Sequence, residues 1–88
     1  MKIKSDIYYR FEEEVGEGTV YIYDYSKEIV VKSNQLTYEV LVQIDEGKDI
    51  EGIKEVLLSK YDEYSKENVT RVFNKIIEFL LKSDIIRI

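Results

Sequence analysis

The sequence predicts an α+β fold in which a three-stranded antiparallel sheet is followed by three helices, an order that is winged-helix-like. Up to about residue 33, apolar and polar residues alternate, and tyrosine, valine and isoleucine are frequent, as in strands. From about residue 34 to 82, apolar residues recur three and four positions apart, as on the buried face of a helix. Strands followed by helices are typical of the α+β class.

The strands are expected at 7–13, 19–25 and 28–33. The first is followed by VGEGT, in which Gly16 and Gly18 supply the flexibility that a hairpin needs. In the second strand, Val20, Ile22 and Asp24 share one face, and the tyrosines and a threonine share the other. A short polar turn leads into the third strand, so the three strands form an antiparallel meander.

Three helices follow, and a capping residue marks the start of each. Ser33 or Asn34 can cap the first helix, Asp49 the second and Ser65 the third. The first helix ends near Gly47, where glycine permits a left-handed stop. The third helix carries the longest apolar stripe, which consists of Val69, Val72, Phe73, Ile76, Ile77, Leu80 and Leu81. The closing residues DIIRI are expected to form an extended tail packed on the domain.

Composition narrows the class of protein. A chain of 88 residues, of which 44% are hydrophobic, suits a single domain over residues 1–88. It has no cysteine and no histidine, so it lacks thiolate metal ligands, the commonest imidazole ligand and the usual general base near neutral pH. No apolar run approaches the ~20 residues of a membrane span, and the N-terminus does not resemble a signal peptide. We therefore expect a cytoplasmic protein without a membrane partner, a catalytic residue, a metal or a cofactor.

The charge of the chain argues against two nucleic-acid functions. The tyrosines at 21, 23 and 25 could stack bases, but their neighbours are acidic and the net charge is −5. The second and third helices could form a helix-turn-helix, but the basic residues of the third helix are interspersed with Glu67 and Glu78. A winged-helix DNA-binding transcriptional regulator remains the alternative reading, and salt-dependent binding to random duplex DNA would reveal it.

Several short segments occur in the same order and at a similar spacing as in a known protein family. They are Ser33-Asn34, Val40-Leu41, Ile44-Asp45-Glu46-Gly47, Asp49-Ile50-x-x-Ile53, Tyr61-Asp62, Val69 to Ile77, Leu80-Leu81 and Ile85-Ile86. Together, over about residues 7–88, they resemble the coenzyme PQQ synthesis protein D (PqqD) family, also called the RiPP recognition element (RRE). The chain departs from the family pattern at three places. Val72 stands where the family often has an aspartate, and Asp84 stands where the family has a glycine. Leu36-Thr37 replaces a pair of small residues.

The resemblance implies a non-catalytic peptide chaperone. Members of this family bind the leader segment of a ribosomally synthesised precursor peptide and present the peptide to a modifying enzyme, often a radical SAM protein. The leader adds as a strand beside the third strand, in a cleft closed by the third helix. Strand addition suits this chain because 29–31 carries neither charge nor proline to protect the edge. The same open edge could also pair two copies of the chain into a homodimer.

The expected peptide-binding residues lie on these two elements. On the strand they are Ile29, Val30, Val31, Lys32 and Ser33. On the third helix they are Asn68, Arg71, Val72, Lys75 and Phe79. At 100° per residue, four of the helix positions run along one side of the apolar stripe. We expect Val72 and Phe79 to form the floor of the groove, with Arg71 and Lys75 at its rim facing acidic leader residues.

Overall fold

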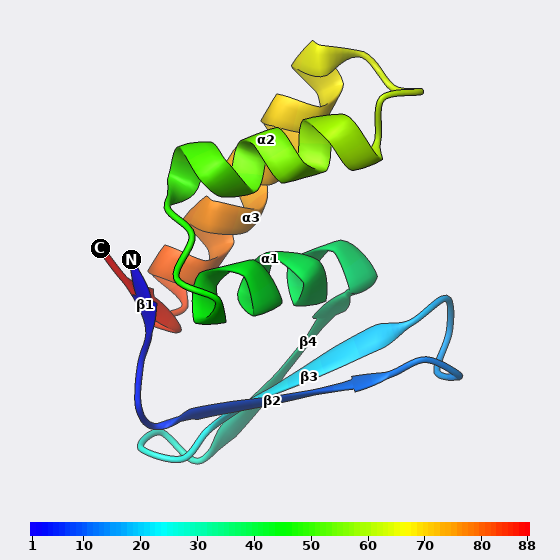
Figure 1. Ribbon diagram of the computed structural model, residues 1–88. Coiled ribbons are helices and arrows are strands. Elements are labelled where there is room, and N and C mark those ends of the chain that lie inside the picture. The colour runs from blue at the N-terminus through cyan, green and yellow to red at the C-terminus, as the bar shows by residue number, and fades with distance from the viewer.

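The computed structural model describes residues 1–88 and has the predicted α+β fold, with a meander of strands followed by three helices (Figure 1). The elements are β1 (Lys2–Ile3), β2 (Ile7–Glu12), β3 (Thr19–Asp24), β4 (Ile29–Asn34), α1 (Gln35–Asp45), α2 (Ile50–Lys60), α3 (Lys66–Lys82) and β5 (Ile86–Arg87). The helices lie together on one side of the three-stranded sheet, and its other face is uncovered (Figure 1).

The sheet has the order β2–β3–β4, with every neighbouring pair antiparallel. On the central strand, Val20, Ile22 and Asp24 are buried against the helices, whereas Tyr21 and Tyr23 lie on the uncovered face. The alternation predicted for this strand is confirmed. It makes β4 and β2 the two edges of the sheet, each with a neighbour on one side only.

The turn between β3 and β4 places the start of β4 one residue later than expected, at Ile29. Glu28 has a φ of 55°, in the left-handed region, and therefore belongs to the turn. Asp24 stabilises this turn, because its Oδ1 accepts hydrogen bonds from the Ser26 hydroxyl at 2.7 Å and from the backbone N–H groups of Ser26 and Lys27. These donors hold the pKa of the Asp24 carboxyl below its usual range.

Each helix begins at the capping residue that the sequence suggested. The side chains of Asn34, Asp49 and Ser65 accept hydrogen bonds from backbone N–H groups three residues later, in the first turns of α1, α2 and α3. After α1 the chain reverses at Gly47, whose φ of 88° is strained for other residues. None of the helices combines the length and the apolar character that crossing a membrane requires.

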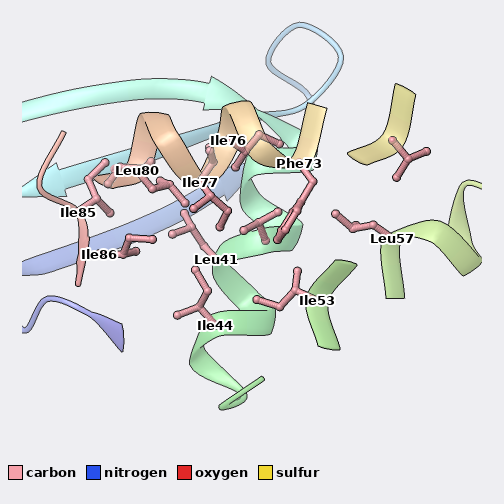
Figure 2. Packing of buried hydrophobic residues seen from close by; sticks show 14 residues of the cluster. Leu41, Ile44, Ile53, Leu57, Phe73, Ile76, Ile77, Leu80, Ile85 and Ile86 are labelled. Carbon is pink, nitrogen blue, oxygen red and sulfur yellow. The ribbon is translucent and has the colours of Figure 1, made fainter. Parts of the chain in front are cut away.

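The core consists of buried residues from β3, from all three helices and from the segment around β5 (Figure 2). Phe73, at its centre, is fully buried between α1 and α2 residues, of which Leu41 and Ile53 are also fully buried. Two residues of the predicted α3 stripe do not belong to it: Val72 is 42% exposed and Leu81 is 37% exposed. They lie on opposite flanks of the stripe, where the apolar arc is wider than the core contact requires.

The two chain ends form a second, two-stranded sheet that the sequence did not predict. β1 pairs antiparallel with β5, with Lys2 opposite Arg87 and Ile3 opposite Ile86, and we call this pair the terminal clasp. A salt bridge between the Lys4 Nζ and Asp84, 2.7 Å long, lies beside it. The expected tail is therefore extended and packed, but it is also paired. Strands of two residues carry no periodic pattern from which pairing could be predicted.

Candidate functional site

The open edge of β4 is the first component of the candidate site, and one hydrogen bond fixes which of its backbone groups are free. The N–H of Tyr25 donates to the carbonyl of Asp6 at 3.0 Å, just beyond the β2–β3 ladder. Hydrogen bonds of a strand alternate from side to side. The N–H and C=O groups of Tyr23 therefore point to β2, and those of Ile22 point to β4.

The same alternation carries over to β4. Val31 lies opposite Ile22 and exchanges hydrogen bonds with it, whereas Val30 and Lys32 lie opposite residues whose amides face β2. The N–H and C=O groups of Val30 and Lys32 consequently point away from the sheet. These four groups have no partner within the chain, which is the condition for pairing with an added strand.

The side chains of β4 alternate between two environments. Ile29, Val31 and Ser33 lie on the helix side of the sheet, and Val31 packs against the core. Val30 lies on the uncovered face and is 53% exposed. Lys32 lies on that face too, with its Nζ 5.8 Å from the centre of the Tyr21 ring. The side chains of a strand added beside β4 would alternate in the same way between the helix side and the uncovered face of the sheet.

The helices leave the β4 half of the sheet accessible. α1 covers the β2 half, where the Tyr38 ring stacks on Phe11 with centroids 4.6 Å apart and the Tyr9 hydroxyl donates to Asp45. Burial, together with this hydrogen bond, raises the pKa of Tyr9. In Figure 2, β4 is the strand that leads into α1. The candidate site therefore starts at the open edge of β4 and continues past Leu36 to residues of α3.

An apolar hollow of about 230 Å³ lies beyond the C-terminal end of β4. Its lining consists of Leu36, Leu57, Tyr61, Tyr64, Asn68, Val69 and Val72. Leu36 comes two residues after β4, so the hollow links the end of that strand to the first half of α3. We call it the apolar hollow. It gives the groove a closed end that could hold one large side chain.

The predicted residues of α3 fall into three places. Asn68 and Val72 line the apolar hollow. Lys75 and Phe79 line a separate, shallower depression further along the helix, where Phe79 is half-buried against the core. Arg71 lies apart from both, in a polar depression without any hydrophobic lining residue. Val72 and Phe79 therefore line two different depressions, and Arg71 does not share a depression with either.

Five residues that line the hollow are not among the site residues that the sequence predicts: Leu36, Leu57, Tyr61, Tyr64 and Val69. Leu36 directly follows a capping residue and its neighbour, so its position suggests only the first turn of α1. Tyr64 and Val69 flank the Ser65 cap at the two positions of a hydrophobic staple, and both residues line the hollow. These residues come together only through the packing of α1, α2 and α3. Among them, Tyr64 is an exposed aromatic ring, with 60% of its surface accessible.

The surfaces of β4 and α3 carry unpaired positive charge. Lys32, Arg71 and Lys75 form no ion pair within the chain, whereas Lys82 is bound by Glu78 at 2.8 Å. The hydrogen bond from Lys82 holds the pKa of Glu78 below its usual range. Unpaired ammonium and guanidinium groups on the surfaces of β4 and α3 favour a ligand that carries acidic side chains.

The titratable pairs elsewhere are structural contacts between elements. The Tyr61 hydroxyl donates to Glu39 at 2.6 Å and joins α2 to α1, and Lys60 binds the same carboxylate. Burial raises the pKa of Tyr61. No group of three or more acidic side chains lies close enough together to hold a metal ion.

No protein-family model matches the chain, and no curated protein matches it. Among solved structures, the chain is similar to TbiB1 in complex with the TbiA(beta) leader peptide. The superposition has a TM-score of 0.80 and covers 97% of this chain and 93% of that chain, at 15% sequence identity. The two proteins share the fold of a three-stranded meander followed by three helices, which is the fold that the family resemblance predicted.

Proposed function

We propose that the protein is a non-catalytic peptide chaperone that binds the leader segment of a ribosomally synthesised precursor peptide. The leader adds as a strand to the edge of β4 and presents the rest of the precursor to a peptide-modifying enzyme. The observation that carries this proposal is the pair of free backbone positions, Val30 and Lys32, on an edge that ends at the apolar hollow. The fold shared with TbiB1, whose structure contains a leader peptide, supports the same function.

The family resemblance favours a radical SAM protein as the modifying enzyme and the cytoplasm as the site of action. The chaperone itself needs no cofactor for this role, because binding uses backbone groups and surface side chains. A short added strand with one anchored side chain would bind with about −8 kcal/mol, which corresponds to a Kd of about 1 μM. Such an affinity permits the precursor to be passed on after modification.

Amide hydrogen exchange by NMR tests the proposal without altering the protein. The ligand is a synthetic peptide that corresponds to the N-terminal segment of a candidate precursor, chosen from the short open reading frames near the gene for this chain. In the free protein, the amides of Val30 and Lys32 should exchange quickly, and added leader should slow both. The Val31 amide, bonded to β3, should be protected in both states.

The opposite edge of the same sheet supplies the control. By the alternation described above, the amides of Tyr9 and Phe11 on β2 also point outward, and the leader should leave their exchange unchanged. Slowed exchange on β2 alone, or on neither edge, would refute the proposed site. Tight, salt-dependent binding to random duplex DNA with no effect of leader would instead support a DNA-binding function.

A further inference from the structure

The peptide that this edge selects can be described residue by residue, on the basis of the proposed function. A strand added to β4 must exchange hydrogen bonds with Val30 and Lys32, because theirs are the free groups. Antiparallel pairing is the more stable geometry per residue. Peptide residues opposite Val30 and Lys32 then face the uncovered side of the sheet, and those opposite Val31 and Ser33 face the helices.

The two positions on the uncovered side differ in chemistry. Val30 continues a cross-strand row with Tyr23 and Tyr8, whose rings lie 5.8 Å apart. Aromatic and β-branched residues extend such a row favourably. Lys32 continues a row with Tyr21 and Arg10 and forms no ion pair, while Arg10 is paired with Glu12 at 2.7 Å. A carboxylate beside Lys32 would supply the missing partner.

The two positions on the helix side both favour apolar side chains. Val31 is half-buried and packs against the core, so a side chain opposite it would meet apolar surface. Ser33 donates its hydroxyl to Thr37 at 2.8 Å, so that hydroxyl is already used within the first turn of α1. Leu36, in the same turn, lines the apolar hollow. A large side chain opposite Ser33 would therefore reach the hollow.

We propose that the β4 edge selects peptides with four consecutive residues of defined chemistry. From the N-terminal to the C-terminal side these are a large apolar residue, a carboxylate, an apolar residue, and an aromatic or β-branched residue. They lie opposite Ser33, Lys32, Val31 and Val30 respectively. The lysine sets the second position, the Tyr23–Val30 row sets the fourth, and the hollow fixes the register.

Selection from a phage-displayed library of random twelve-residue peptides tests this pattern. The wild-type protein should enrich the four-residue pattern. Lys32→Glu should replace the carboxylate at the second position with lysine or arginine and keep the other three positions. Lys54→Glu, the same charge change on α2, should leave the pattern unchanged.

A synthetic peptide of the selected sequence provides the quantitative test. Exchanging its second and fourth residues keeps the composition but mispairs Lys32 and Val30, and should weaken binding about fivefold. If the selected peptides bind Lys32→Glu as tightly as wild type but do not bind Val30→Pro, the inferred pattern is wrong and strand addition still holds. Enrichment of the reversed order would also overturn it, because it indicates parallel pairing. If the selected peptides bind Val30→Pro as tightly as wild type, the proposed function itself is refuted.

Discussion

Val30 lies opposite Tyr23 on the uncovered face of the sheet, and Val31 lies opposite Ile22 on the buried face. Their amides point in opposite directions as well, the first to solvent and the second to β3. Two adjacent valines of identical chemistry therefore have different functions. One is free to pair with a ligand strand, and the other holds the sheet together.

Proline substitution separates these two functions. Val30→Pro removes a free N–H and should leave the fold nearly intact while abolishing measurable leader binding. Val31→Pro removes a hydrogen bond to β3 and leaves its acceptor unpaired, so it should lower the free energy of unfolding by about 2 kcal/mol or more. Urea denaturation and isothermal titration with leader peptide measure the two effects.

Val30→Ala is the matched control, because it shortens the side chain and keeps the N–H. It should retain most of the affinity that Val30→Pro loses. If a folded Val30→Pro protein binds leader as tightly as wild type, the peptide does not pair with β4. The uncovered tyrosine face around Tyr23 would then be the next surface to test.

Val72→Asp should weaken leader binding by about 2 kcal/mol, because it places a charge in the apolar hollow that the peptide must cover. The side chain is 42% exposed in the free protein, so the variant should remain folded. Leu81→Asp is the control on the other flank of α3, where Leu81 lines a depression with Ile50 of α2. Titration should show a loss for Val72→Asp only, and equal losses would exclude the hollow as part of the site.

We expect the free protein to associate weakly with itself through the β4 edge. Ile29 and Val30 are both about half exposed there, and residues 29–31 contain no charge or proline. Leader peptide would occupy the same backbone groups and should dissociate the dimer, as measured by sedimentation velocity. A dimer that leader leaves undisturbed would have to form through another surface.

Asp84 should make stability depend on pH at the terminal clasp. The hydrogen bond from Lys4, with added attraction from Lys27, holds the pKa of Asp84 below its usual range. The stabilisation is therefore present above the unfolded pKa of about 4 and is lost as the pH falls through the lower folded value. Urea denaturation should show a smaller difference between wild type and Asp84→Asn at pH 3 than at pH 7. A difference that does not change with pH would exclude the ion pair as its cause.

The meander and the helix starts were predictable because their signals are local. Val20 and Ile22 alternate with tyrosines, and Asn34, Asp49 and Ser65 each cap a helix within one turn. The terminal clasp was not predictable, because Ile3 and Ile86 are far apart in the chain and their strands are too short for a pattern. Tertiary contact, and not periodicity, decides such pairings.

The residues of the candidate site differ in how far the sequence indicates their placement. Its β4 residues follow from an uncharged edge strand, and Val72 follows from helical spacing. The expectation that Arg71 lies at the rim together with Lys75 depended on the helix alone, and the structure places the two in different depressions. Leu36 and Tyr64 entered the site because three helices converge there, which no single segment of the sequence encodes.

The terminal clasp also decides how the molecule would respond to a mechanical load. Its two strands are antiparallel and the chain ends emerge side by side (Figure 1), so a force that separates the ends acts along the hydrogen bonds between β1 and β5. Bonds loaded in this direction open one after another, as in a zipper, and yield at lower force than strands sheared along their length. Stretching the chain would therefore peel Ile3 from Ile86 before it strained the apolar hollow, because Leu36 lies in the first turn of α1 and β1 lies beside its last turn.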